Sequence, residues 1–180
     1  PSICPPGMSL KALEMRRIPI TRRVMVVGGG IAGIEAALQI ADSGYEVVLV
    51  EKQAELGGWA AKLWKRAPAR TPFTDPIDTG IADLVARASK HPRIKVCLNS
   101  TIAETSGAPG KFSVQIATES GATTTEMVGA IIQSTGFTSY DINKLPELGG
   151  GKSANVVDQA GLERLAADAG MPERGRQHQR

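Results

Sequence analysis

The sequence predicts an α/β fold in three layers, with a central parallel sheet, flanking helices and an inserted antiparallel meander. The first observation is a strand–turn–helix–strand unit over residues 24–51, in which glycines interrupt an otherwise apolar pattern. The second is a pair of short apolar runs, at residues 94–98 and 130–137, each suited to a buried parallel strand. The third is a set of segments rich in Thr, Val and Ile, separated by Gly, Pro and Ser turns, at residues 101–105, 111–118 and 123–128.

The first unit opens with a β-branched strand over residues 24–27, followed by Gly28, Gly30 and Gly33 at the spacing of a dinucleotide fingerprint. In that arrangement Gly28 makes the tight turn, Gly30 lets a pyrophosphate approach the backbone, and Gly33 lets the helix pack close to the strand. The start of the helix attracts an anion, because its backbone N–H groups are free and its dipole is positive there. The unit therefore predicts a Rossmann-like dinucleotide site.

An amphipathic helix and a second strand complete the unit. Apolar residues recur at helical spacing over residues 34–41, Gly44 stands where a helix C-cap is needed, and residues 45–50 form the strand. Glu51 follows, 18 residues after Gly33 (51 − 33). A carboxylate at this point can accept hydrogen bonds from a ribose diol and would repel a 2′-phosphate. The pattern therefore favours NAD or FAD over NADP.

A second glycine motif follows Glu51. We expect Gly57 and Gly58 to open a helix through Trp64, with backbone that can lie against the phosphates of a cofactor. Trp59 and Trp64 can pack over a cofactor or, equally, in a core or an interface.

The segment after this motif, residues 66–76, contains three prolines and is expected to be a loop. Arg70 and Thr71 in this loop are candidates for approaching a flavin or a phosphate, and the alternative is a solvated surface arginine.

The remaining elements are expected to bring a third strand end to the same edge of the sheet. Asp78 or Thr79 caps a helix running to about Lys90, and the later strand ends in Ser134-Thr135-Gly136, at the carboxyl edge where doubly wound folds bind ligands. Beyond it we expect a loop over residues 141–151, a helix over 159–169 and a disordered tail over 171–180.

Length and charge distribution limit the number of domains and the kinds of partner that the chain can have. The length of 180 residues suits one domain. The net charge of +3 is concentrated near the ends: residues 11–23 carry five basic residues and one acid (+4), residues 171–180 carry three arginines and one acid (+2), and the body is left at −3 (3 − 4 − 2). No basic stripe is expected on the folded body, so nucleic acid is a poor candidate as partner.

Cysteine usage and hydropathy point to an intracellular protein. Cys4 and Cys97 provide neither a disulfide framework nor metal-ligand spacing, although Cys4 could be the end of an upstream iron–sulfur site. No apolar stretch is long enough for a membrane span and no signal peptide is evident, so we expect a cytoplasmic location. The chain begins at Pro1 without an initiator Met, which suggests processing or a piece of a longer protein.

The assembled motifs resemble the FAD-binding half of flavoproteins with two dinucleotide-binding domains. Within that class the chain looks like the flavoprotein component of heterodisulfide reductase and its relatives in quinone-interacting membrane-bound oxidoreductase complexes, over roughly residues 18–168. The narrower resemblance rests on residues 20–33, 70–74, 91–96, 106–112, 136–141, 144–145 and 149–152.

The resemblance implies a set of cofactor-binding residues and a role in electron transfer. Family members use the flavin to pass electrons between iron–sulfur clusters and a redox partner, so iron–sulfur clusters are expected only in partner chains or missing regions. The chain departs from the family in lacking cysteines over residues 63–76, in lacking the later Gly-Asp element and in its tail after Gly170. The implied FAD-binding residues are Gly28, Gly30, Ile31, Ala32, Gly33, Glu51, Lys52, Gly57, Gly58, Thr135 and Gly136.

The main functional hypothesis is therefore an FAD-binding redox flavoprotein, either a whole component of a complex or a fragment, that passes electrons between protein partners. Residues 21–170 are its FAD-binding domain, and residues 1–20 are a linker or the remnant of an upstream domain. An NAD(H)-binding module of a pyridine nucleotide-disulfide oxidoreductase and an inactive, truncated scaffold remain as alternatives. No side chain stands out as an acid, a base or a nucleophile, so the chemistry would belong to the flavin.

Overall fold

A computed structural model describes residues 19–73 and 75–169, and within them the predicted parallel sheet is present. The strands β1 (Arg23–Val27), β2 (Glu46–Val50), β3 (Ile94–Cys97) and β7 (Ala130–Gln133) are all parallel and lie in the order β3-β2-β1-β7. Their carboxyl ends therefore meet at one edge of the sheet. Cys4 and the expected tail over residues 171–180 lie outside the described residues.

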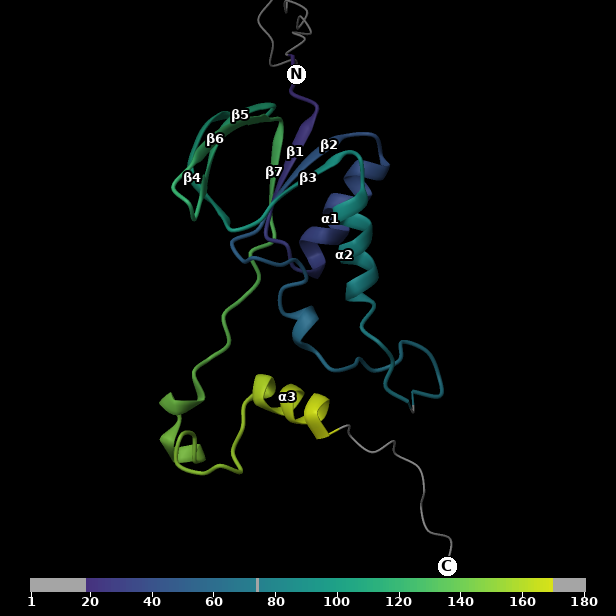
Figure 1. Ribbon diagram of the computed structural model, residues 1–180, viewed down its shortest axis with the longest axis vertical. Helices are drawn as coiled ribbons and strands as arrows, with labels where there is room; N and C mark the ends of the chain where they lie inside the picture. The colour runs from purple at the N-terminus through teal and green to yellow at the C-terminus, as the bar shows by residue number, and fades with distance from the viewer. Residues whose placement is uncertain (1–18, 74, 170–180) are drawn as a thin grey trace, which may run out of the picture.

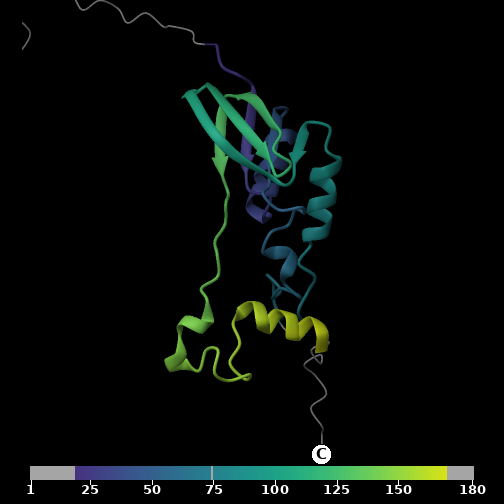
Figure 2. The ribbon, with the colours of Figure 1, turned by 60° about the vertical axis from the view of Figure 1, so that its left-hand side comes forward.

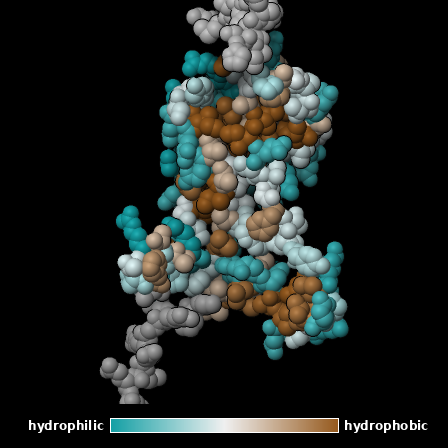
Figure 3. Space-filling view, turned by 180° about the vertical axis from the view of Figure 1, so that it is seen from behind, coloured by the Kyte–Doolittle hydropathy of each residue, from teal (hydrophilic) through white to brown (hydrophobic). Residues whose placement is uncertain are grey.

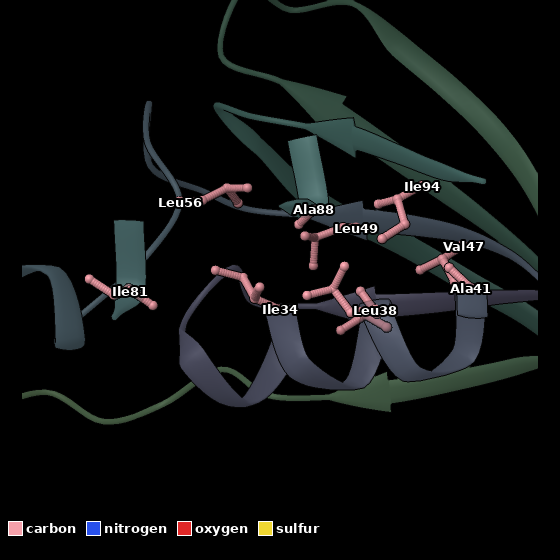
Figure 4. Close-up of a cluster of buried hydrophobic side chains, with 11 residues drawn as sticks. Ile34, Leu38, Ala41, Val47, Leu49, Leu56, Ile81, Ala88 and Ile94 are labelled. Carbon is pink, nitrogen blue, oxygen red and sulfur yellow. The ribbon is translucent and has the colours of Figure 1, made fainter. Parts of the chain in front are cut away.

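Two helices cover one face of this sheet. Helix α1 (Ile31–Asp42) buries the apolar face predicted from its sequence, and α2 (Ile81–Lys90) packs beside it. Figure 4 shows Ile34 and Leu38 of α1 pointing toward Val47 and Leu49 of β2, with Ile94 of β3 beside them. Burial of these side chains is what holds the α1 N-terminus against the carboxyl ends of β1 and β2.

The antiparallel meander forms the third layer, on the opposite face. Strands β4 (Ser100–Ala108), β5 (Lys111–Thr118) and β6 (Thr123–Val128) pair in chain order as a separate sheet. Figure 1 shows this sheet and the two helices on opposite sides of the parallel sheet. Alternate residues of β2 therefore face different layers: Val47 and Leu49 face the helices, whereas Val48 and Val50 pack with Val114 and Ile116 of the meander, and the predicted three-layer α/β class is confirmed.

A buried carboxylate links the meander to the parallel sheet. Glu126 of β6 is only 9% exposed and accepts hydrogen bonds from Lys95 of β3 (Nζ to Oε1, 2.7 Å) and Arg23 of β1 (Nη1 to Oε2, 2.9 Å). Arg23 also pairs with Glu46 of β2. The hydrogen bond from Lys95 lowers the pKa of Glu126 below its ordinary value of 4.5, and the charge of Arg23 acts in the same direction.

The segment after β7 extends away from the three layers, and its helix contacts the loop that follows β2. Figures 1 and 2 show an extended connection that leads to α3 (Gln159–Ala169), and the backbone N–H of Trp64 donates to Oε2 of Glu163 in this helix at 2.9 Å. Leu148, Leu162 and Leu165 in this segment are exposed, and Figure 3 shows apolar surface at this end of the molecule.

Several predicted boundaries are wrong in detail. The helix expected from Gly57 to Trp64 is a single 3₁₀ turn, η1 (Ala60–Lys62), and the expected loop over residues 141–151 contains two more, η2 (Ile142–Lys144) and η3 (Pro146–Leu148). The last parallel strand ends at Gln133, before the Ser-Thr-Gly sequence. No helix among the described residues is long and apolar enough to cross a membrane.

The buried ion cluster predicts a pH-dependent contribution to stability. We expect Glu126→Gln to lower the free energy of unfolding by about 2 kcal/mol at neutral pH, because two charge-assisted hydrogen bonds lose their ionised acceptor. Since the folded-state pKa lies below the ordinary value, this contribution is present above pH 4.5 and is lost as the pH falls through the folded-state pKa.

Urea unfolding of wild type and variant over a pH series measures this difference, which should shrink on acidification. Glu104→Gln on β4 is the matched control, because Glu104 is exposed and accepts a hydrogen bond from the neutral amide of Gln115. A Glu126→Gln difference that persists unchanged at low pH would contradict this assignment.

Candidate functional site

A cleft of about 300 Å³ opens at the carboxyl edge of the parallel sheet, where the ends of β1, β2 and β7 meet. Its volume lies at the lower end of the range for small-molecule pockets. The backbone is drawn together here by hydrogen bonds from Gly28 N–H to Val50 O and from Ser134 N–H to Val27 O, both 2.8 Å. The lining residues are Gly28, Gly30, Ile31, Ala32, Glu51, Lys52, Gln53, Gly58, Trp59, Ala60, Lys62, Ser134, Thr135, Gly136 and Phe137.

The three fingerprint glycines have different surroundings. A Cβ added to Gly33 would lie 1.8 Å from the carbonyl oxygen of Gly28, and one added to Gly28 would lie 2.2 Å from that of Ser134. These two glycines therefore permit the close packing of helix and strands. A Cβ on Gly30 would meet nothing within 4 Å, so this glycine leaves a cradle on the cleft side into which a ligand can approach.

The first turn of α1 faces the cleft without a side-chain cap. Gly30 is its N-cap residue, with φ −74° and ψ −179°, and no acidic side chain lies in the first turn. Ile31 and Ala32 line the cleft at this point. Because the first N–H groups of a helix have no partner within it, this turn offers donors and a positive dipole end to an anion.

Glu51 holds the glycine turn in place. Its side chain is buried, with 7% exposure, and Oε2 accepts the N–H of Gly29 at 2.5 Å while Oε1 accepts the N–H of Gln53 at 2.9 Å. Each carboxylate oxygen has a second lone pair, so a ribose hydroxyl can still bind it. The sequence predicted the ribose role alone, and the structure adds this positioning role.

The Gly57-Gly58 pair packs against the glycine turn that follows β1. The N–H of Gly57 donates to the carbonyl of Gly29 at 2.8 Å, and both Gly57 (φ +112°) and Gly58 (φ +54°) adopt backbone conformations that favour glycine. A Cβ on Gly58 would lie 3.0 Å from Cα of Gly30. Gly58 therefore lines the cleft directly beside Gly30 at the start of α1, whereas Gly57 supports this contact from behind.

Two aromatic rings bridge the sides of the cleft. Trp59 follows Gly58 and Phe137 follows Gly136, and their ring centroids are 5.8 Å apart with an interplanar angle of 59°. The Nζ of Lys62 lies 5.6 Å from the centroid of the Trp59 ring. The site therefore combines backbone donors, one buried carboxylate, two aromatic rings and the exposed lysines Lys52 and Lys62.

The structure brings most of the predicted site residues together. All eleven line the cleft except Gly33 and Gly57, which shape it from behind, and the candidates Arg70, Thr71 and Trp64 do not line it. Gln53 and Phe137 also line the cleft but were not predicted to do so. Each directly follows a predicted site residue, Lys52 or Gly136, so their positions in the sequence could have indicated them. Ala60 and Lys62 could not be found in this way. They reach the cleft through the 3₁₀ turn η1, whereas the sequence predicts a longer helix here.

The chemistry of the lining favours binding over proton transfer. The ionisable side chains on the cleft are Glu51, whose two oxygens already accept backbone N–H groups, and two lysines. Within the described ranges no group of three or more His, Cys, Asp or Glu residues could hold a metal ion. The first N–H groups of α1 lie beside a carboxylate whose oxygens have further lone pairs, and this arrangement fits a dinucleotide.

Comparison with known proteins supports this interpretation. The family model of the FAD dependent oxidoreductases matches residues 23–136, from the first residue of β1 to the glycine beyond β7. The chain is 40% identical, over 107 residues, to an iron-sulfur component of the CoB–CoM heterodisulfide reductase of Methanopyrus kandleri and to a heterodisulfide reductase-like protein of Archaeoglobus profundus. These matches cover 59% of this chain but only 16% and 15% of the two relatives.

A solved structure shows the same fold. Thioredoxin reductase from T. acidophilum superposes with a TM-score of 0.52 at 21% identity, over 68% of this chain and 38% of that one. Together the matches confirm the Rossmann-like fold, the resemblance to the heterodisulfide reductase flavoproteins and FAD as the cofactor, and they do not favour the NAD(H)-module and scaffold alternatives. With a family match over more than half of its length, the chain belongs to the FAD dependent oxidoreductases.

Proposed function

We propose that the chain binds FAD in the cleft at the carboxyl edge of the sheet and serves as the flavin domain of an electron-transfer assembly. The observation that best supports this proposal is the hydrogen bond from the Gly29 N–H to the Glu51 carboxylate. It fixes the glycine turn so that the open side of Gly30 and the first turn of α1 face the cleft. The domain corresponds to residues 21–170 in this proposal.

Each wall of the cleft suits a different part of the dinucleotide. The N–H groups of the first α1 turn would bind the diphosphate, where Gly30, Ile31 and Ala32 line the cleft. Glu51 and Lys52 would hold the adenosine end. Thr135 and Gly136 line the cleft beyond β7, and they would lie along the riboflavin side.

The bound flavin supplies the capacity to accept and release one or two electrons. The side chains of this chain bind the cofactor, orient it and cover part of it with the Trp59 and Phe137 rings. The curated relatives that it matches are described as iron-sulfur subunits of heterodisulfide reductases. We therefore propose iron–sulfur proteins as the redox partners, and FAD as the link between an electron donor and an acceptor.

Ligand titrations test the proposed cofactor directly. Thermal unfolding is measured with FAD, ADP and NADH in separate series, because a ligand that binds only the folded state raises the midpoint. We expect FAD and ADP to raise it, with FAD giving the larger shift at equal concentration. Stabilisation by NADH alone, or by none of the three, would overturn the proposal.

Two glycine substitutions separate binding from folding. Gly30→Ala should weaken ADP binding by about tenfold or more while changing the free energy of unfolding by less than about 1 kcal/mol, because the new methyl group enters the open cradle at an ordinary φ. Gly33→Ala is the matched comparison and should lower stability by about 3 kcal/mol or more, because its Cβ meets the Gly28 carbonyl.

Calorimetric titration with ADP and urea unfolding measure the two effects. Gly30→Ala protein that binds ADP as well as wild type would show that the diphosphate does not lie in this cradle.

A further inference from the structure

We propose that Lys62 is the cation that pairs with the diphosphate of the bound dinucleotide, and that Trp59 positions it. This inference deepens the proposed function and rests on it, because it assigns the charge recognition of the same site. It concerns a residue outside both glycine motifs, placed by the η1 turn.

The side chain of Lys62 is oriented by an aromatic ring. Its Nζ lies over the Trp59 ring at 5.6 Å from the centroid, and both residues line the cleft. In the described part of the chain no ion pair involves Lys62, in contrast to Lys95, which pairs with Glu126. An unpaired ammonium over an aromatic face is positioned, yet it remains available to an anion.

The place of this lysine in the cleft matches the diphosphate. Gly58 packs against Gly30, and the chain then runs through Trp59 into η1, so Lys62 lines the same cleft as the first turn of α1. The α1 turn offers N–H donors but no basic side chain. Lys52 lies next to Glu51, at the adenosine end. Lys62 therefore supplies a positive side chain for the diphosphate, which the first turn of α1 lacks.

The ring contact between Trp59 and Phe137 holds this arrangement in place. The two rings come from loops on different strand ends, and their tilted contact fixes the platform on which Lys62 rests. A cation–π contact at an exposed site is weak, so the ammonium can turn from the ring to a phosphate oxygen.

The chain contains a matched control pair. Lys65 lies over the ring of Trp64, with Nζ 4.9 Å from the centroid, and neither residue lines the cleft. Lys62 and Lys65 are both exposed, so substitution of either by glutamine removes the same charge from a similar contact. Only one of the two positions faces the cleft.

The test compares Lys62→Gln and Lys65→Gln in the full chain by titration with ADP and, separately, with adenosine. We expect Lys62→Gln to bind ADP about fivefold to tenfold more weakly, to keep wild-type affinity for adenosine, and to show a weaker dependence of ADP binding on salt. Lys65→Gln should match wild type for both ligands.

A Trp64→Phe variant gives a second readout, because the chain contains only two tryptophans and Trp59 then remains as the sole reporter. Its emission should change on addition of ADP, and this change should be smaller after Lys62→Gln. Equal ADP affinity of Lys62→Gln and wild type, or equal losses in both lysine variants, would overturn the role of Lys62. Wild-type protein that binds neither ADP nor FAD would instead overturn the proposed function itself.

Discussion

The hydrogen bond from the Gly29 N–H to the buried Glu51 carboxylate is the interaction on which the site depends. It joins the end of β2 to the turn after β1, and the second oxygen of the same carboxylate holds the N–H of Gln53. A buried carboxylate is stable only when it is well hydrogen-bonded, and here backbone donors provide that compensation. The turn is thereby fixed with the first N–H groups of α1 directed at the cleft. The proposed binding of the diphosphate at this edge thus requires no rearrangement of the turn.

The three layers give this interaction a rigid base. Strand β2 is buried on both faces, by the helices on one side and the meander on the other, so the position of Glu51 at its end is tightly determined. The Glu126 cluster ties the meander to β1 and β3 at the opposite edge of the sheet. The segment from β7 to α3, by contrast, makes few contacts with the layers and exposes apolar side chains. The most tightly packed part of the site is therefore the end of β2, where the adenosine half of FAD is proposed to bind.

The sequence predicts the elements that depend on local patterns, such as hydrophobic period and glycine spacing. It does not predict the conformations that depend on contacts between distant segments. The period of α1, the parallel strands and the glycine spacing identified the fold and most of the lining of the cleft. The sequence predicts a helix that opens at Gly57 and Gly58 and runs through Trp64. In the structure the N–H of Gly57 donates to the carbonyl of Gly29, and the chain forms only one 3₁₀ turn. Lys62 was missed for that reason. The hydrogen bonds of Glu51 to backbone donors were also beyond prediction, because they depend on how two loops meet.

In the proposed complex this fixed turn presents free N–H groups to the diphosphate of a dinucleotide. Amide hydrogen exchange of the full chain, with and without saturating ADP, measures those groups individually. We expect ADP to slow exchange strongly at Gly30, Ile31 and Ala32, whereas the N–H of Gly29, already bonded to Glu51, should change little. Protection confined to another part of the chain, with unchanged exchange at these three residues when ADP is bound, would contradict the proposed binding of the diphosphate.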